Sequence, residues 1–580
     1  TTIGGATDVN GKYEINAPTN AQALTFSFVG FKVQDVAIVG RAIIDVALES
    51  ESVEMKEVVV TALGITRQKK ALGYTVQDVK GDDIVKGANP NLMTALSGKI
   101  AGVEIRQSSG MPGAPSQILI RGARSFSGTN TPLYVIDGLP ITSESDYSSN
   151  VTGTSYSNRA LDIDPNDIES INVLKGQAAA ALYGLRASNG VIIITTKKGK
   201  GATAGTPTVT VASSVTIDKV SILPELQTTY AQGSNFGFAP ANSFSWGPKI
   251  EDLPLNATYG GNSYPGHTGE FFDPYKGIWT TPKSYENAKN FYDKNGVTYV
   301  NSINISNSTQ HGNYSIGFGS TNQTGIIAKT GMDRYTAKMG GDFKLAEKWN
   351  VGFSGNYSDI SMKKLPSGND SWLFTVYGAP PSYDLNGGNY SQEGTFGNYR
   401  QISYRRGAVG VNPYWAINNN HYYETTKRFF GNGYLEFKPT SWATIKYQIG
   451  IDNYGTDNEN YKEMGYGNLP SAAQYPTPNN PVFTYIEPTG GEINNYGLNR
   501  RIINSLLTMS FNHKFNEDLI GNLVLGNEID DNQSEYYNTY GSGFTTPGWN
   551  SLSNTNTQNS AYDSYHRRTG GVFANLGLDY

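Results

Sequence analysis

Hydrophobic and polar side chains alternate along several segments in the second half of the chain. In residues 334–345, Tyr335 and Met339 fall on one face of an extended strand, and every ionisable side chain, including Arg334 and Lys338, falls on the other. An arginine or lysine that faced lipid at mid-depth would cost about 2–4 kcal/mol. This segregation predicts transmembrane β-strands. The same alternation occurs in 314–319, 349–358 and 443–452.

The alternating segments and the links between them predict a barrel. Ten strands are expected, at 207–218, 297–308, 313–322, 334–345, 349–360, 428–438, 442–453, 501–515, 519–530 and 568–580. Long links (219–296, 361–427, 454–500 and 531–567) alternate with short ones (309–312, 346–348, 439–441 and 516–518), and 323–333 is intermediate. Short turns on one side and long loops on the other are typical of an outer-membrane barrel. A soluble sandwich has no reason to sort its loops in this way.

Three units precede the barrel. Residues 1–50 predict a small β-sandwich of short strands, with a tight turn at Asp8–Gly11. Residues 51–74 are a charged and polar linker, and residues 75–200 alternate short helices and strands, as in a small α/β domain. From 207 onward the pattern is the barrel.

The linker contains a compact run of β-forming residues, Glu57–Gly64. Such a run beside a flexible linker can add as an edge strand to the sheet of another protein. It can equally be the last strand of the first domain, and the residues alone do not decide between the two.

Composition narrows the class of protein. Only 38% of the residues are hydrophobic and 16% are charged, whereas Gly (66) and Tyr (38) are abundant. This favours β-structure with many turns and with aromatic rings at a water–lipid boundary. There is no cysteine, and a net charge of −5 gives no reason to expect nucleic-acid binding. No stretch is long and apolar enough for a membrane helix. No leader peptide is visible at Thr1, so we expect that a leader and some further residues precede it.

Candidate catalytic or metal-binding groups are scattered. The histidines occur singly, without the spacing of a metal site, at His267, His311, His421, His513 and His566. No phosphate-binding P-loop is present, and no pair of carboxylates stands out among fifty acidic residues. The sequence therefore predicts neither an enzyme nor a cofactor nor a metal.

Five motifs in residues 96–192 carry a family resemblance. They are Leu96–Val103, Ile118–Gly122, Leu133–Pro140, Ile163–Ile171 with Val173–Gly176, and Ala180–Gly184 with Ala187–Ile192. In this order, and followed by the alternating strands, they resemble the plug of SusC/RagA-family TonB-linked outer-membrane receptors of Bacteroidetes-type bacteria. Residues 11–31 resemble the later strands of the carboxypeptidase-regulatory-like β-domain that begins these receptors.

The resemblance gives roles to particular residues. It identifies Glu57, Val58, Val59, Val60, Thr61, Ala62, Leu63 and Gly64 as the TonB box, recognised by β-addition. It implies structural or gating roles in the plug for Arg121, Gly122, Asp137, Gly138, Lys175, Gly176, Tyr183, Gly184, Asn189 and Gly190. It also implies a barrel of 22 strands when complete. At about 37 residues per strand such a barrel needs roughly 800 residues, so we expect the chain to end within it.

The resemblance also implies a function. A nutrient oligomer, oligosaccharide first and oligopeptide second, would be imported across the outer membrane of a Gram-negative bacterium. The TonB–ExbB–ExbD system would supply the energy, and a SusD-like surface lipoprotein would form the lid. The first domain would lie in the periplasm and the barrel would face outer-membrane lipid. The alternatives are a non-transporting structural or adhesive barrel and a secreted glycan-binding protein or enzyme.

Two further expectations concern side chains. An arginine such as Arg121 at the end of a plug strand is costly to bury unpaired, so we expect it to bond to carboxylates and tie plug to barrel. Aromatic residues of the long loops suit either ligand recognition or an interface with the lid, and the sequence does not decide. The candidates are Trp246, Trp279, Trp372, Tyr404 and Trp415.

Overall fold

The computed structural model describes most of the chain. Outside the description lie residues 1–3, 6, 9–10, 19–20, 29–30, 32, 49–57, 61–65, 69–75, 88, 127–129, 143–156, 176–182, 201, 203–204, 241, 293, 366–371, 387–401, 403, 405–411, 466–474, 482–489, 517–518 and 580. By contacts the chain forms two compact units. The first comprises Thr1–Val59 with Arg67–Lys70, and the second contains the remaining residues.

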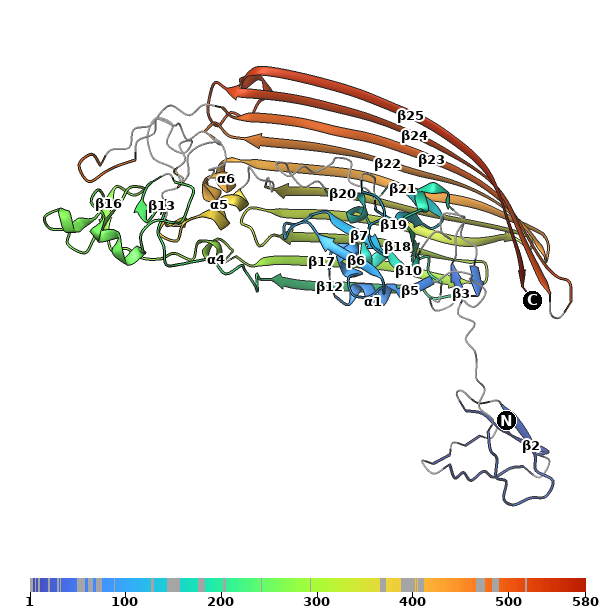
Figure 1. Cartoon of the computed structure of the whole chain (residues 1–580). Coiled ribbons are helices and arrows are strands. Elements are labelled where there is room, and N and C mark those ends of the chain that lie inside the picture. Colours follow the sequence, from blue (N-terminus) through green and yellow to red (C-terminus); the bar gives the residue numbers. More distant parts are fainter. Residues whose placement is uncertain are drawn as a thin grey trace. The chain divides into compact units, whose positions relative to one another are not determined.

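A ten-stranded antiparallel sheet, here called the wall, dominates the second unit (Figure 1). Its strands pair in chain order: β12 (Thr208–Asp218), β17 (Gly296–Thr309), β18 (Gly312–Thr324), β19 (Gly331–Ala346), β20 (Trp349–Lys364), β21 (His421–Thr440), β22 (Ala443–Lys462), β23 (Glu492–Lys514), β24 (Ile520–Phe544) and β25 (Thr555–Asp579). All ten strands predicted from the alternation are present. The mostly β fold class is therefore confirmed.

The two faces of the wall differ as the alternation predicts. On β19, Tyr335 and Met339 are 55% and 52% exposed on the outer face, whereas Arg334 and Lys338 are almost fully buried on the inner face. On β22, Ile449 is exposed and Asp452 is buried. At these positions the outer face carries apolar side chains, as a lipid-facing surface requires, and the ionisable side chains point to the inside.

Several strands are longer than predicted, which corrects the loop bounds 361–427, 454–500 and 531–567. β24, for example, continues to Phe544, and its residues up to Ser542 pair one by one with residues of β23. Residues 536–543 are rich in Tyr, Asn, Ser and Gly and lack the alternation from which strands were inferred. Their pairing rests on the backbone ladder and on cross-strand bonds such as Tyr540 Oη to Glu492, at 3.0 Å.

The long and short connections lie at opposite ends of the wall (Figure 1). The long ones carry small elements: β13 (Gly233–Ser234), β14 (Gly237–Phe238), β15 (Phe271–Asp273), β16 (Ile278–Thr280), α4 (Asn287–Phe291), α5 (Trp372–Gly378), α6 (Pro413–Asn419) and 3-10 turns at Ile250–Leu255, Gly261–Ser263 and Leu552–Asn554. The predicted loop 219–296 contains the first five of these elements and ends where β17 begins at Gly296.

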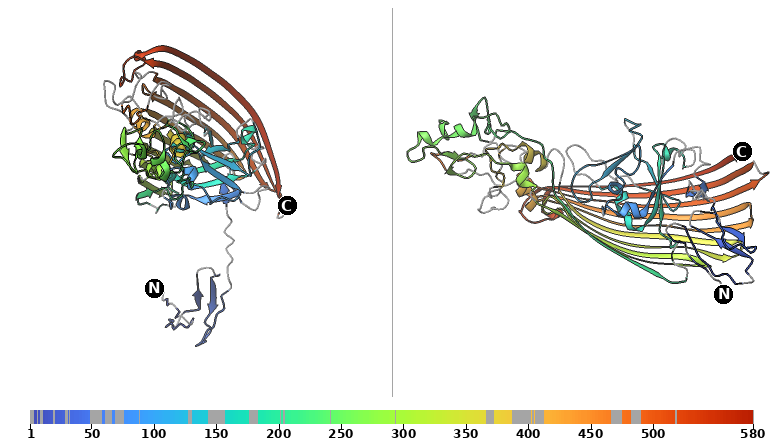
Figure 2. Two further views of the ribbon diagram at one scale, coloured as in Figure 1. Left: turned by 60° about the vertical axis from the view of Figure 1, so that its left-hand side comes forward. Right: turned by 90° about the horizontal axis from the view of Figure 1, so that it is seen from below.

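Residues 76–200, here called the plug, lie on the inner, concave face of the curved wall (Figure 2). A mixed sheet runs in the order β5 (Val76–Lys80), β10 (Ile168–Leu174), β11 (Val191–Thr196), β8 (Leu133–Ile136) and β9 (Leu139–Ile141). A separate hairpin joins β6 (Val103–Gln107) and β7 (Ser116–Ile120), and α1 (Gly81–Val85), α2 (Leu92–Ala95) and 3-10 turns at Arg159–Asp162, Pro165–Asp167 and Leu185–Ala187 complete the plug.

The local sequence accounts for these plug elements. Asn91 caps α2 by accepting a hydrogen bond from the Met93 amide, and Asp164 caps the turn that starts at Pro165. Apolar residues of both sheets and of α1 and α2 pack into one core. The alanine-rich segment 177–182, which the sequence predicts to be helical, falls outside the described residues.

The first unit contains a two-stranded antiparallel sheet of β1 (Ala23–Phe26) and β2 (Gln34–Ala37). The predicted turn is present, since Gly11 has φ of +79° and its amide donates to the Asp8 carbonyl at 3.0 Å. Residues 43–48, one of the short β-forming runs of the predicted sandwich, form no regular strand. Instead Ile44 is buried and its carbonyl accepts from the Tyr13 hydroxyl at 2.8 Å. Among the described residues, no helix is long and apolar enough to cross a membrane.

Candidate functional site: the plug–wall interface

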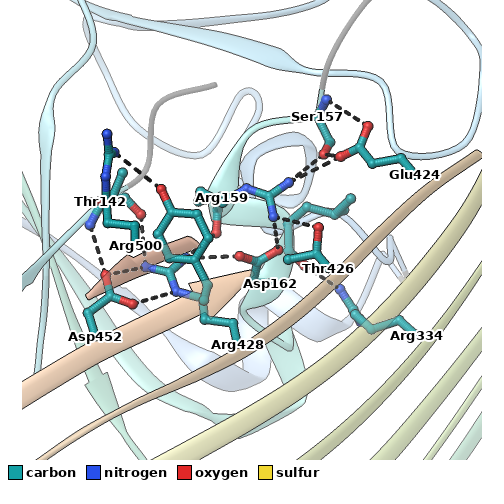
Figure 3. Close-up of polar contacts among 12 residues, drawn as sticks. Thr142, Ser157, Arg159, Asp162, Arg334, Glu424, Thr426, Arg428, Asp452 and Arg500 are labelled. Atoms are coloured by element: carbon teal, nitrogen blue, oxygen red, sulfur yellow. Dashed lines mark hydrogen bonds and ion pairs between the residues drawn. The ribbon is translucent and has the colours of Figure 1, made fainter. Parts of the chain in front are cut away.

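The strongest link between plug and wall is centred on Arg428 of β21 (Figure 3). Its guanidinium is fully buried and donates to both carboxylate oxygens of Asp452 on β22, at 2.8 and 2.7 Å. It also donates to Asp162 of the plug at 3.0 Å. A buried cation is tolerated only when it is paired and its hydrogen bonds are satisfied. Two carboxylates, one from each partner, meet that requirement here.

Arg428 also holds the plug backbone. It donates to the carbonyls of Arg159 and Thr142, at 3.0 and 2.9 Å, while the Thr142 amide donates to Asp452 at 3.2 Å. Its guanidinium carbon lies 5.3 Å from the centre of the Tyr454 ring. One wall arginine therefore fixes two plug positions that are distant in sequence.

A second group of charges surrounds Glu424 of β21. The plug residue Arg159 donates to Glu424 at 3.2 Å and to the Thr426 hydroxyl at 2.7 Å. Lys364 of β20 donates to the other oxygen of Glu424 at 2.9 Å, and the Ser157 hydroxyl also bonds to this carboxylate. These side chains are almost completely buried. Glu424 is thus the shared anion of one plug cation and one wall cation.

β19 supplies a third set of contacts. Arg334 donates to the plug carbonyls of Pro90 and Leu161, at 2.8 and 3.1 Å, and lies 3.8 Å from Asp164. Lys338 donates to the Asp167 carbonyl at 2.9 Å. Burial raises the pKa of Asp167 to about 7, and the neighbouring Asp164 carboxylate raises it in the same direction.

The end of the plug is fastened near the short turns. Lys198 and Lys200 lie 3.5 and 3.8 Å from Asp342 of β19, and the Asn313 side chain donates to the Lys198 carbonyl at 2.6 Å. Gly199 has φ of +83°, and a Cβ there would lie 2.2 Å from the Tyr314 carbonyl oxygen. Only glycine permits this approach.

Arg121 does not make the expected contact within the part of the chain that the structure describes. Its side chain is exposed just past β7, at φ of +58°, and forms no ion pair with a carboxylate in the part of the chain that the structure describes. The strand ends at Ile120, so the next side chain reaches solvent instead of the wall. Arg159, Arg334 and Arg428 make the ties instead. The alternation had placed Arg334 on the inner face, but nothing in the sequence distinguished Arg159 or Arg428.

Other predicted plug residues occupy turns and packing positions. Asp137 (φ +48°) and Gly138 (φ +86°) form the turn between β8 and β9, where Asp137 accepts from the Thr196 amide and hydroxyl at 3.0 and 2.7 Å. Lys175 donates to Gln77 at 2.8 Å, and burial, followed by the charge of Arg121, lowers its pKa. Positive φ angles occur at Gly122, Gly184 and Gly190. Tyr183 is buried, and the Asn189 side chain donates to the Thr131 carbonyl at 3.4 Å. Gly176 falls outside the described residues.

Within the predicted TonB box, residues Val58–Val60 form the strand β3. It pairs with β4 (Thr66–Gln68) in a sheet of two strands. Glu57 and residues 61–64 fall outside the described part.

Three of the five candidate loop aromatics are core residues, which corrects their proposed role. Trp372, Tyr404 and Trp415 are at most 3% exposed, and Trp372 stacks on Phe291 with ring centres 5.1 Å apart. Trp279 is partly buried and stacks on His267 at 4.3 Å. Only Trp246, at 66%, is largely exposed. Sequence could not separate them because buried and exposed loop aromatics share the same polar neighbours.

A curved sheet with an apolar outer face, whose inner face holds a folded domain through buried charges, has the architecture of a plugged outer-membrane receptor. Comparisons agree. The TonB-dependent Receptor Plug Domain family matches residues 68–191, and the CarboxypepD_reg-like domain family matches residues 1–60. TonB-dependent receptor P26 of Formosa agariphila is 29% identical over 453 residues, which cover 78% of this chain and 40% of that protein. TonB-dependent receptor SusC of Bacteroides thetaiotaomicron is 39% identical over 219 residues, 38% of this chain and 20% of that protein.

Solved structures show the same fold. The RagAB peptide importer in its "open-open" state superposes with a TM-score of 0.64 at 21% identity, over 90% of this chain and 55% of that chain. The chain is similar to the SusC/RagA type of TonB-dependent receptors. It spans 40% or less of the curated relatives named above and about half of the matched RagAB chain.

Proposed function

We propose that this chain is the plug-bearing part of a receptor that imports a nutrient oligomer across the outer membrane. The observation that carries the proposal is the buried ionic interface, which ties a folded plug to the inside of a lipid-type wall. A candidate coupling strand precedes this plug in the sequence. An oligosaccharide is the first candidate substrate and an oligopeptide the second. RagAB is a peptide importer, but at 21% identity it supports only the fold for this chain.

Energy would enter through residues 57–64. β3 has one partner strand, β4, in its sheet, so its other edge can pair with a strand of TonB through main-chain hydrogen bonds. The TonB–ExbB–ExbD system would convert the inner-membrane proton gradient into a pull on this strand, with the first domain in the periplasm. The receptor itself then needs no cofactor and performs no chemical step.

A SusD-like lipoprotein lid would dock on the loop end of the wall. Phe236, Phe244 and Trp246 expose 60–69% of their surfaces there. Their backbones are linked, since the Phe236 amide donates to the Trp246 carbonyl and the Gly233 amide to the Phe244 carbonyl. These three rings, here called the aromatic trio, offer the kind of anchor that recurs at the centre of protein interfaces.

Uptake tests the proposal through one backbone position. Val59→Pro removes the amide that β-addition requires, whereas Val59→Thr keeps both the amide and the β-propensity. The proline variant should lose binding to the TonB C-terminal domain and uptake of fluorescent oligosaccharide and oligopeptide mixtures, and the threonine variant should retain both. Equal uptake in the two variants, with binding lost in the first, would instead favour a barrel that does not use TonB.

A further inference from the structure

The outer face of the wall carries a band of mainly apolar side chains, here called the apolar band, which ends at a defined residue on each strand. Towards the long loops, its last outward-facing apolar residue is Phe429 on β21, Ile503 on β23 and Ile529 on β24. On β21 the band covers residues 429–437, which at about 3.3 Å each and a tilt of 35–45° span roughly 21–24 Å. This height is close to the roughly 25 Å expected of the lipid-facing belt of a barrel. The loop-side edge of the band therefore marks a boundary between lipid and water.

Three cations stand directly beyond this edge. The first outward-facing polar residue past the band is Lys427 on β21, Arg501 on β23 and Arg568 on β25. Lys427 and Arg568 each expose 69% of their side chains, and Arg501 is also exposed. These three residues, here called the cationic row, lie outside the wall and make no contact with the plug.

The stagger of the sheet places the cationic row at one depth in the membrane. In the strand register Arg501 is level with Phe429, two residues from the level of Lys427. The residue of β25 that is level with Arg501 is His566, so Arg568 lies two residues further in the same direction. Barrel strands tilt by about 35–45°, so a line of constant depth crosses successive strands at staggered residues. The edge of the apolar band shifts in the same direction from strand to strand.

Arg501, at the centre of the row, pairs with an amide instead of a carboxylate. It donates to the side-chain oxygen of Gln533 at 2.8 Å, and it forms no ion pair within the part of the chain that the structure describes. A guanidinium carries five N–H donors in a planar fork that matches the oxygens of a phosphate. Arg501 therefore keeps donors with which it can bind an anion at the edge of the lipid.

The two flanking cations have carboxylate partners at the surface. Lys427 lies 3.8 Å from Asp359, and Arg568 lies 2.6 Å from Asp531. Exposed ion pairs of this kind contribute little to stability, so an anionic head group can compete for the cations. Three cations and two carboxylates leave one net positive charge along the row.

The opposite edge of the apolar band lacks such cations. In the described strands β19–β25, no arginine or lysine occupies an outward position on the short-turn side of the band. Aromatic rings occupy that edge instead, such as Trp349, which stacks on Phe437 with ring centres 4.4 Å apart. Aromatic residues occur at both interfaces of a barrel, so they do not distinguish the two leaflets. Outward cations at one edge alone indicate that the lipid on the loop side has the more anionic head groups.

We propose that Lys427, Arg501 and Arg568 bind the phosphate groups of a phosphorylated glycolipid of the lipid A class in the outer leaflet, with its acyl chains along the apolar band of β21–β25. Alternate strands lie about 10 Å apart, so a head group with two phosphates can contact two members of the row. The inference goes beyond import and rests only on the proposed orientation, with the long loops outside the cell.

Native mass spectrometry of the full-length receptor in mild detergent tests the site. The probes are diphosphoryl lipid A, the same lipid after removal of both phosphates, and phosphatidylglycerol. For diphosphoryl lipid A at low ionic strength, Arg501→Gln should weaken binding about fivefold and Lys427→Gln/Arg501→Gln/Arg568→Gln on the order of a hundredfold. Arg501→Lys, which keeps the charge, should retain most of the affinity. The dephosphorylated lipid and phosphatidylglycerol should bind the wild type and the triple variant equally weakly.

A matched triple variant controls for net charge. Lys344→Gln/Lys348→Gln/Lys514→Gln also removes three exposed cations, but near the short turns, and should bind diphosphoryl lipid A as the wild type does. Equal losses in the two triple variants, or undiminished binding of the dephosphorylated lipid, would overturn the inference. Phosphatidylglycerol that bound as tightly and with the same dependence on the row would show general attraction to anionic lipid and would also overturn it.

Two further measurements keep the result unambiguous. The side chains of the row are exposed, so the variants should unfold at the wild-type temperature in lipid-free detergent. If the triple variant does not fold, Arg501→Gln alone decides, and unchanged binding in it would overturn the inference. Uptake that does not depend on residues 57–64 would reject the proposed import function but would leave the lipid site in place.

Discussion

Arg428 of the wall and Asp162 of the plug lie 3.0 Å apart, and neither side chain is exposed to solvent. Their pairing depends on Asp452, which shares the guanidinium, and on the carbonyls of Thr142 and Arg159, which satisfy its remaining N–H groups. Such a site fixes one docked position, because sliding the plug by one residue would leave a buried charge without a partner.

Replacing Arg428 should therefore destabilise the docked plug strongly. Arg428→Met removes the cation that the buried carboxylates of Asp162 and Asp452 share, and breaking such a pair costs about 3–5 kcal/mol. Its neighbour Lys427 points outward, with 69% of its side chain exposed, and pairs only loosely with Asp359 at 3.8 Å. Lys427→Met should change stability by no more than about 0.5 kcal/mol. Thermal unfolding in detergent compares the two, and similar losses would show that Arg428 does not carry the docking.

Glu424 should keep the plug closed against ion flow. Glu424→Gln removes the charge shared by Arg159 and Lys364 while keeping the size of the side chain. Two buried cations then face each other with less compensation, so the plug should loosen. We expect larger and more frequent current openings in planar bilayers than for wild type. Asp359→Asn, at an exposed pair, is the control, and equal leak in both variants would contradict the role of Glu424.

Asp167 should make plug docking depend on pH. It belongs to the plug, and its pKa is raised to about 7 by burial and by Asp164, against the lowering effect of Lys338. The folded plug then binds this proton more tightly than the unfolded chain does. Its contribution to stability is fully present below the ordinary carboxyl pKa, near 4, and is lost as pH rises through about 7.

Unfolding midpoints between pH 5 and 8 check this sign. Asp167→Asn cannot ionise, so its stability relative to wild type should rise across this range. A difference between variant and wild type that is constant with pH would contradict the raised pKa.

The sequence predicted the wall well and its inner face only in part. The alternation of apolar and polar residues predicts strand faces correctly where one face meets lipid. Tyr335 and Lys338 were therefore placed on the correct faces. The alternation fails at residues 536–543, where both faces of β24 are polar and only the backbone ladder defines the strand. The motifs located the plug, but they did not indicate that Asp162 would meet Arg428, because that pairing depends on how two surfaces dock.

The aromatic candidates show the same limit. Trp372 and Trp246 lie in similar loop sequence, yet one is buried in a core and the other is exposed. Trp372→Ala should cost about 3–5 kcal/mol by leaving a cavity among the loop aromatics. Trp246→Ala should leave the unfolding temperature nearly unchanged. Equal losses measured by calorimetry would mean that Trp246 is packed in solution.

Phe236 allows stability and function to be separated. It lies with Asn235 in the two-residue turn between β13 and β14, at φ of +59° and +50°, and its ring is 69% exposed. A bulky residue in this region of backbone space is strained by about 1–3 kcal/mol, and the exposed ring contributes little packing in return. Strain that the fold does not need is consistent with a residue kept for binding.

Phe236→Gly should therefore raise the unfolding temperature and weaken binding of the lipoprotein lid, measured with the lid that co-purifies with the native receptor. Phe244 belongs to the same trio but has no positive φ, so Phe244→Ala should weaken binding of the lid without stabilising the receptor. If Phe236→Gly stabilised the receptor and left lid binding intact, the aromatic trio would not be the docking surface. The ring would then be a consequence of the turn alone, and the lid would contact other loops.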